Sequence, residues 1–206
     1  MEGGSFGEMS VDEFLVAVGS KTPTPGGGAV ASAVGALGSS LAQMVLNYSI
    51  GKKSLATHEG RLRGAMLQLT RASELFMALA AEDAEAYGQV NALSRLPEGD
   101  SRRQRELPDA VAASVQVPMT TIAACVDILR LFEELASITN KQLRSDLAIA
   151  AVLTDAAARS SRWNVLVNMS GLTDANKRME VGRQLTELLT ESKRLMDRVE
   201  RACEAS

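Results

Sequence analysis

The hydrophobic pattern of this chain has the period of an α-helix over most of its 206 residues, and no stretch alternates as a β-strand does. Ser10 and Glu13 have the spacing of a capping box, which predicts a short helix to about Val18. Longer helices are expected over residues 29–50, 55–94, 101–116, 118–138, 145–171 and 174–202. The predicted fold is all-α: a single-domain bundle of long antiparallel helices over residues 10–206, after a flexible leader over residues 1–9.

Single residues set several of the expected helix boundaries. Pro118 is expected to kink or restart a helix, because proline has no amide hydrogen. After a break at Thr139-Asn140, either Ser145 or Asp146 is expected to cap the next helix. Asp155 and Arg159, four residues apart on that helix, are most simply a surface ion pair.

Residues 29–50 contain no charged side chain, so a membrane span has to be considered. The stretch is dominated by Ala, Gly and Ser and includes Asn47, which favours a helix that is buried on all sides by protein. Ala31, Gly35 and Ser39 recur every four positions. They would let a neighbouring helix approach closely, in the same chain or in a partner.

The glycine-rich turn from Pro23 to Gly28 precedes this uncharged helix. It formally matches a dinucleotide-binding fingerprint, but no strand comes before it. Free N–H groups at a helix N-terminus suit a carboxylate or phosphate, and a plain tight turn is the alternative. At the other end, Lys52 and Lys53 either complement the helix dipole or bind an anion.

Steps of four and three residues from Leu62 to Val90 define an apolar seam in which Asp83 is the one carboxylate. Burying a carboxylate is costly unless it is paired or functional, and desolvation would raise its pKa toward the range useful for acid–base catalysis. The alternative is a structural ion pair. Asn164 and Asn168 share one helix face, where they could recognise a polar heterocycle or tie off helix ends.

Composition and charge narrow the functional classes. A net charge of −3 argues against nucleic acid as a partner. One histidine and two distant cysteines argue against a metal site and indicate reduced thiols in a cytoplasmic protein. The first ten residues do not read as a signal peptide.

Several motifs together resemble the cyclodeaminase/cyclohydrolase family, which includes formiminotransferase-cyclodeaminase and stand-alone methenyltetrahydrofolate cyclohydrolases. The resemblance covers residues 10–202, with Thr139 where the family usually has glycine and Ala29 where it often has serine. The segments that carry it, in chain order, are 23–31, 35–38 and 51–53, then Asp83-Ala84-Glu85-Ala86-Tyr87, Val117-Pro118-Met119, Thr139-Asn140, Ser145-Asp146-Leu147 and Asn164-Val165-Leu166-Val167-Asn168.

The resemblance implies an all-α homodimer that forms through its helices and binds a tetrahydrofolate derivative as substrate, with no membrane contact, no metal and no tightly bound cofactor. It assigns the catalytic proton transfer to Asp83, with Asp146 as a second carboxylate. The implied substrate-binding residues are Pro25, Gly26, Gly27, Gly28, Asn47, Lys52, Lys53, Asn140, Asn164 and Asn168.

Three functions remain in competition. The first is a methenyltetrahydrofolate cyclohydrolase, which hydrolyses 5,10-methenyltetrahydrofolate to 10-formyltetrahydrofolate. This is favoured because the chain is too short to hold a formiminotransferase domain, unless that enzyme is a separate protein. The second is a formimidoyltetrahydrofolate cyclodeaminase, which releases ammonia from 5-formiminotetrahydrofolate. The third is a non-catalytic helical dimer that binds folate or acts as a scaffold.

Overall fold

The computed structural model of the chain describes residue 7 and residues 9–204, and within these it contains helices and turns but no strand, as predicted. Most of the predicted leader, residues 1–6 and 8, lies outside the described residues. In chain order the elements are α1 (Val11–Gly19), α2 (Gly27–Asn47), the 3-10 helix η2 (Lys53–His58), α3 (Glu59–Ser94), α4 (Ser101–Leu135), the 3-10 helix η3 (Lys141–Leu143), α5 (Arg144–Met169) and α6 (Ala175–Glu204).

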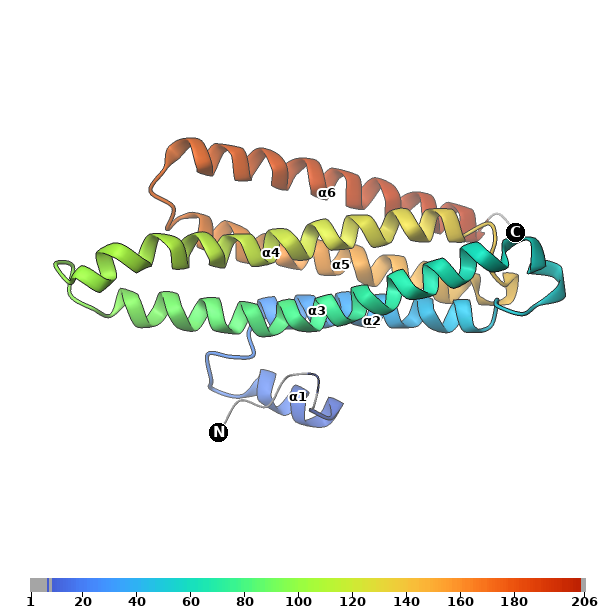
Figure 1. Cartoon of the computed structure of the whole chain (residues 1–206), viewed down its shortest axis with the longest axis horizontal. Helices are drawn as coiled ribbons and strands as arrows, with labels where there is room; N and C mark the ends of the chain where they lie inside the picture. The colour runs from blue at the N-terminus through green and yellow to red at the C-terminus, as the bar shows by residue number, and fades with distance from the viewer. Residues whose placement is uncertain (1–6, 8, 205–206) are drawn as a thin grey trace.

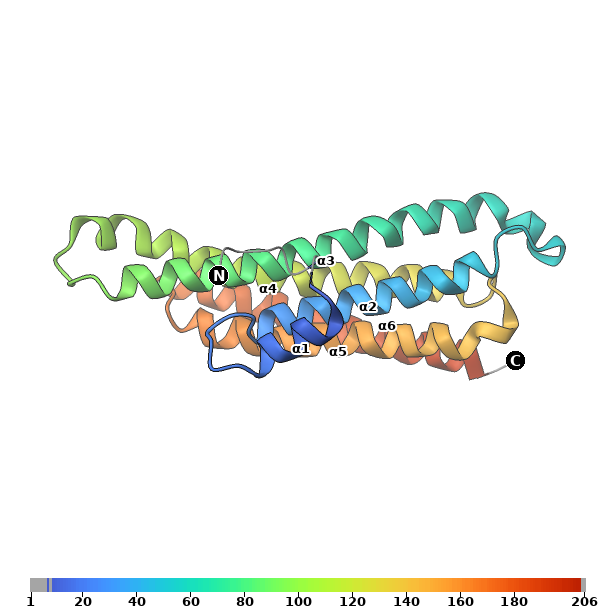
Figure 2. The same cartoon turned by 90° about the horizontal axis from the view of Figure 1, so that it is seen from below.

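Helices α2 to α6 lie side by side along the long axis, and each runs antiparallel to the next in the chain (Figure 1). Their antiparallel order follows from the short turns between them. Helix α1 lies beside α2, outside the bundle, in both views (Figures 1 and 2). None of the residues of α1 is buried. The bundle is therefore formed by five helices, and α1 is an arm.

Two predicted helix starts are confirmed in atomic detail. Ser10 and Glu13 form the capping box of α1, in which the Ser10 amide donates to the Glu13 carboxylate at 2.7 Å. Asp174 precedes α6 and accepts hydrogen bonds from the amides of Asn176 and Lys177. Both caps satisfy amide groups that have no partner within the helix.

Three other predicted boundaries were wrong. Helix α3 begins at Glu59 rather than near residue 55, because η2 occupies the intervening residues. Helix α4 is continuous through Pro118 instead of restarting there. Helix α5 begins at Arg144 with Leu143 in the cap position, so neither Ser145 nor Asp146 is its cap. Packing against neighbouring helices overrides the local signal in α4.

The small residues of α2 allow close approach, as predicted. A methyl group placed on Gly35 would lie 2.9 Å from the ring of Phe76 on α3. One placed on Gly38 would lie 2.6 Å from Thr154 Oγ1 and 3.0 Å from the carbonyl oxygen of Ala150, both on α5. Helix α2 therefore fits tightly between α3 and α5.

One face of α2 stays open within the single chain, however, so burial of this helix on all sides stays a prediction that only a partner could complete. Leu37 is 61% exposed there. Within the described residues, α2 and α4 are long and apolar enough to cross a membrane, but about half of each such stretch is buried inside the bundle. Core helices commonly show this composition, so it is weak evidence for a span.

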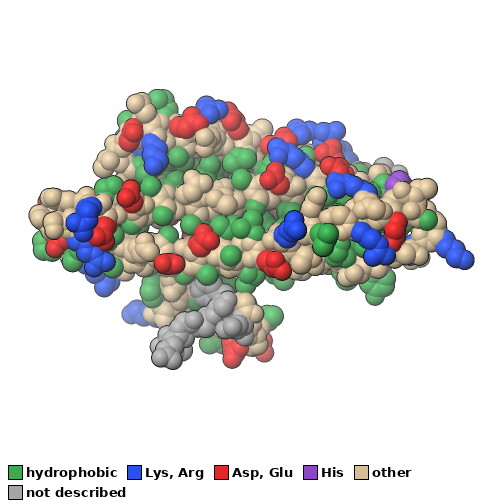
Figure 3. All heavy atoms as spheres, viewed as in Figure 1, with side chains coloured by type: hydrophobic (Ala, Val, Ile, Leu, Met, Phe, Trp, Pro, Cys, Tyr) green, Lys and Arg blue, Asp and Glu red, His purple; other side chains and the backbone are tan. Residues whose placement is uncertain are grey.

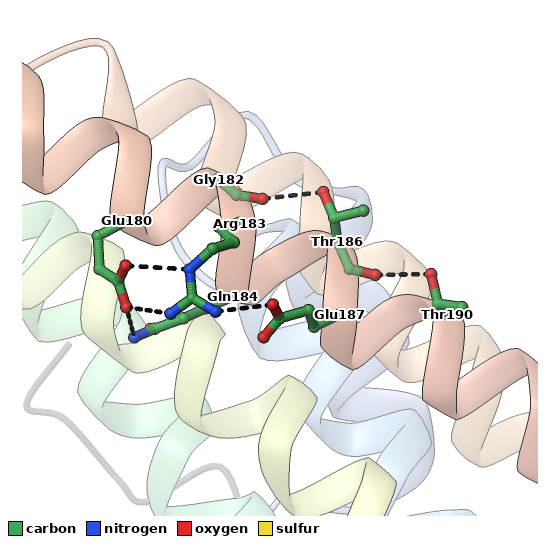
Figure 4. Close-up of polar contacts among 7 residues, drawn as sticks. All are labelled: Glu180, Gly182, Arg183, Gln184, Thr186, Glu187 and Thr190. Carbon is green, nitrogen blue, oxygen red and sulfur yellow. Dashed lines mark hydrogen bonds and ion pairs between the residues drawn. The ribbon is translucent and has the colours of Figure 1, made fainter.

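Polar contacts at the surface are mostly local to one helix. Along α6, Arg183 lies between the carboxylates of Glu180 and Glu187, and threonine hydroxyls donate to carbonyl groups four residues earlier (Figure 4). Charges of both signs are spread over the face shown in Figure 3. Exposed pairs of this kind contribute little to stability because water and salt screen them, so buried apolar packing holds the helices together.

The ion pair predicted on α5 is present, but its carboxylate is buried rather than at the surface. Asp155 is 2% exposed and accepts a hydrogen bond of 2.8 Å from Ser192 Oγ on α6. Arg159 approaches only to 3.9 Å and remains exposed. The nearby thiol of Cys125 is also buried, and burial together with the Asp155 charge raises its pKa well above the usual range, so this cysteine is held as an unreactive thiol.

The close approach of α2 to α5 leads to a stability prediction. Gly38→Ala is expected to lower the free energy of unfolding by about 1–3 kcal/mol, because the added methyl group meets backbone and the branched side chain of Thr154. Gly64→Ala, on α3 with open space around it, is expected to raise it by about 0.5–1 kcal/mol. Urea unfolding measures both, and equal effects of the two substitutions would contradict this packing.

Candidate functional site

A cavity of about 450 Å³ opens where the start of α2 meets the second half of α3 and the end of α5. Its walls come from four helices and from the turn before α2, so residues far apart in the sequence meet there. They are Pro23, Thr24, Gly26, Gly27, Gly28, Asp83, Ala86, Tyr87, Val90, Asn91, Ser94, Ser114, Asn164, Val167 and Asn168. Apolar, amide and carboxylate groups thus line one concave site, which is typical of a small-molecule pocket.

The carboxylate of Asp83 lies directly against Gly28, in the first turn of α2. A methyl group on Gly28 would overlap the carboxylate carbon and both carboxylate oxygens of Asp83. Asp83 is half-buried and Gly28 is buried. The glycine therefore provides the space that the carboxylate occupies at the cavity wall.

Burial raises the pKa of the Asp83 carboxyl above its ordinary value, and burial is the one cause of this shift. Within the described residues, no salt bridge involves Asp83. The structural ion pair that the sequence left open is therefore not found there. A carboxyl whose pKa is raised by burial at a cavity wall is a candidate for giving and taking protons in catalysis.

The two asparagines of α5 lie on the cavity wall opposite Asp83's helix. Asn164 Oδ1 faces Gly27, since a methyl group there would lie 3.6 Å from it. Asn168 Nδ2 donates a 2.7 Å hydrogen bond to the carbonyl oxygen of Ser114 on α4. Side-chain amides that are held in this way can recognise the donor and acceptor pattern of a heterocycle.

Apart from Pro25, the other residues that the resemblance selected lie at the opposite end of the bundle. Asn47 ends α2, Lys52 and Lys53 lie at the start of η2, and Asp146 is in the first turn of α5. Asp146 and Asn164 are separated by about 27 Å along α5 at 1.5 Å per residue. Within one chain, the predicted site residues therefore lie in two separate groups. The roles assigned to them stay predictions.

Asn140 belongs to this distant group and is fully engaged in holding helix ends. Its backbone amide donates to Ser49 Oγ at 2.9 Å, and its side-chain nitrogen donates to the Tyr48 carbonyl at 3.4 Å. Its side-chain oxygen accepts from the Gln142 amide. Pro25 is buried in the turn before α2 and does not line the cavity.

Sequence reasoning missed several lining residues, among them Asn91, Ser94 and Ser114. Asn91 and Ser94 lie eight and eleven residues after Asp83 in the sequence, so helical spacing alone places them on its face of α3. Ser114 carries no such signal, because its place in the wall depends on how α4 packs against α5.

The helices, the cavity and the Asp83 carboxyl together define an all-helical protein with a small-molecule site. Comparison with known proteins identifies the family to which it belongs. The profile of the family described as formiminotransferase-cyclodeaminase matches residues 10–187. The chain belongs to this family.

Three relatives differ in length and in the activity for which they are named. A methenyltetrahydrofolate cyclohydrolase of Methylorubrum extorquens is 31% identical, covering 94% of this chain and 95% of its own. A formimidoyltransferase-cyclodeaminase of Gallus gallus is 29% identical over 87% of this chain, but that match spans only 34% of the longer protein. The crystal structure of a formiminotetrahydrofolate cyclodeaminase from Thermotoga maritima superposes with a TM-score of 0.89 at 32% identity, over 97% of this chain and 98% of that one.

The contact between Gly28 and Asp83 can be tested by stability measurements. Gly28→Ala is expected to lower the free energy of unfolding by about 1–3 kcal/mol, because the methyl group displaces the carboxylate. In a chain that carries Asp83→Ala, the same substitution is expected to have little effect. Gly27→Ala is the matched control, with only ordinary contact to Asn164. A double-mutant cycle measures the coupling, and additive effects would contradict the contact.

Proposed function

We propose that the protein is a methenyltetrahydrofolate cyclohydrolase, which hydrolyses 5,10-methenyltetrahydrofolate to 10-formyltetrahydrofolate. The observation that carries the proposal is the half-buried Asp83 carboxyl, which lies against Gly28 at the wall of the cavity with its pKa raised by burial. The match to a cyclohydrolase over nearly the full length of both chains supports this choice of reaction.

In the proposed reaction, water adds to the methenyl carbon between N5 and N10 of the substrate. Asp83 takes a proton from the attacking water, and a tetrahedral carbon forms. The same carboxyl then protonates N5 as the bond from N5 to this carbon breaks. The hydroxyl on this carbon loses its proton to solvent and becomes the carbonyl of the formyl group on N10, so one proton is released overall. A carboxyl whose pKa is raised by burial is suited to both steps, since its ionised form is a stronger base than an exposed carboxylate.

The alternative reaction uses the same site on a different substrate. In a formimidoyltetrahydrofolate cyclodeaminase, N10 attacks the formimino carbon on N5, and ammonia leaves after it is protonated. The similarity to the Thermotoga maritima cyclodeaminase favours this alternative. A cytoplasmic location and a separate formiminotransferase that supplies the substrate would accompany it. A non-catalytic folate-binding dimer is the third candidate.

Asp83→Asn is expected to lower the rate by about 10²–10⁴-fold, because the amide cannot transfer the proton. The measurement is the absorbance change of 5,10-methenyltetrahydrofolate and, in parallel, of 5-formiminotetrahydrofolate. Turnover of the first alone supports the cyclohydrolase, and turnover of the second supports the cyclodeaminase. A well-folded wild type that consumes neither would leave only the non-catalytic candidate.

Stability against pH is the control for this substitution. Because the folded-state pKa of Asp83 is raised, the ionised carboxylate destabilises the fold above that pKa, and this cost disappears as pH falls through it. Asp83→Asn should therefore unfold at a temperature no lower than wild type at pH 7, and the difference should narrow in acid. A variant that unfolds far below wild type at pH 7 would make the loss of activity uninformative and contradict the assigned burial cost.

We also propose that two copies associate through the outer face of α2 and α5. Ile149, Val152, Trp163 and Val167 are exposed on α5, where Arg159 and Arg162 lie beside Trp163, and Leu37 is exposed on the adjacent α2. Exposed apolar side chains that gather on one face are typical of an interface. Helix α1, with exposed Val11, Leu15 and Val16, lies beside α2 and would extend the contact (Figure 2).

A two-fold axis across α2 would also reunite the two groups of predicted residues. Such an axis places the η2 end of one copy near the cavity end of the other, as an isologous interface requires. The site would then combine Asp83, Asn164 and Asn168 of one copy with Lys52, Lys53 and Asp146 of its partner. The lysines would bind the glutamate tail of the substrate.

Mixing two inactive variants tests this arrangement. If Asp146 acts at the partner's cavity, Asp83→Asn and Asp146→Asn chains that have exchanged subunits should recover about a quarter of wild-type activity, since half of the pairs hold one intact site. Activity after co-refolding, with the mass from light scattering, is the measurement. No recovery, or a monomeric wild type, would contradict the shared site, and a fully active Asp146→Asn would remove Asp146 from it.

A further inference from the structure

Pro118 is buried in the middle of α4, where a proline is normally unfavourable. Proline has no amide hydrogen, so the carbonyl oxygen four residues earlier lacks its helical partner. That carbonyl belongs to Ser114, which lines the cavity. The continuous helix therefore carries one acceptor beside the candidate site that its own backbone does not satisfy.

Asn168 on α5 supplies the missing donor. Its Nδ2 lies 2.7 Å from the Ser114 carbonyl oxygen. A carbonyl can only accept, so this contact fixes which end of the Asn168 amide faces α4. The side-chain oxygen must then be on the other branch of the planar group, and within the described residues no hydrogen bond reaches it. Asn168 therefore has an unbonded side-chain oxygen that can accept a hydrogen bond from a ligand in the cavity, beside the one N–H that the Ser114 carbonyl does not take up.

We propose that Pro118 is a positioning residue for this site. By leaving the Ser114 carbonyl without a helical donor, it reserves that acceptor for Asn168 and so fixes the Asn168 amide with its oxygen available to the ligand. The matching ligand group is an N–H donor, such as the amino and ring N–H groups of a pterin. The identity of this ligand rests on the proposed function, whereas the orientation of Asn168 does not.

The chain contains a matched control in the same helix. Pro108 also lies inside α4, ten residues before Pro118, but neither it nor Gln104, the residue four positions earlier, lines the cavity. Pro108→Ala and Pro118→Ala both restore an amide hydrogen to α4. They differ in whether the carbonyl that receives it is the one bonded to Asn168.

Steady-state kinetics on 5,10-methenyltetrahydrofolate test the proposal. Pro118→Ala is expected to raise KM by about three- to tenfold, the effect of roughly one hydrogen bond, with kcat within about twofold of wild type. Pro108→Ala should leave both unchanged. Asn168→Ala should raise KM at least as much, and adding Pro118→Ala to it should raise KM no further. An unchanged KM for Pro118→Ala, or additive effects in the double variant, would overturn the proposal.

A second measurement needs no enzymatic activity. It tests the hydrogen bond of Asn168 in the wild type even if Pro118→Ala does not fold. NMR of the wild type should show an Asn168 side-chain NH₂ group whose protons exchange slowly, identified by its absence in Asn168→Ala. A folded Pro118→Ala should lose this protection, and Pro108→Ala should keep it. Unprotected Asn168 protons in the wild type would overturn the proposal, whereas absence of turnover with protected protons would count against the proposed function alone.

Discussion

The close approach of α2 to its neighbours is the constraint on which the rest of the structure depends. Three positions along this helix without a side chain face three different groups: Gly28 the Asp83 carboxylate, Gly35 the ring of Phe76, and Gly38 the backbone of α5. Because a packed interior does not deform easily, these contacts fix how α2 lies against α3 and α5. The wall of the cavity is then determined by the same helix placement that forms the core.

The sequence was sufficient for the helices and for the most informative residue of the site. The apolar seam of α3 has a regular spacing, so the pattern alone shows that a carboxylate within it is out of place. The capping signals of α1 and α6 were equally local and equally reliable. The errors came where tertiary packing competes with a local rule, as at Pro118, whose lost hydrogen bond is compensated from a different helix.

The grouping of site residues could not be predicted from the sequence in the same way. Motifs follow one another along the chain, but a helix of 21 residues separates its two ends by about 30 Å. The glycines at the start of α2 and the lysines after its end therefore cannot meet within one chain. The order of the motifs along the chain does not show this distance, whereas the length of the helix does.

The space at Gly28 also has a consequence for how this site can change over generations. While Asp83 is present, any side chain at position 28 collides with it, so the two positions cannot vary independently. If a lineage first lost the carboxylate, position 28 would become free to accept alanine, which favours the helix by about 0.5–1 kcal/mol. An aspartate that returned at position 83 would then collide with the methyl group of the alanine at position 28. Loss of the Asp83 carboxylate would thus be easier in evolution than its return.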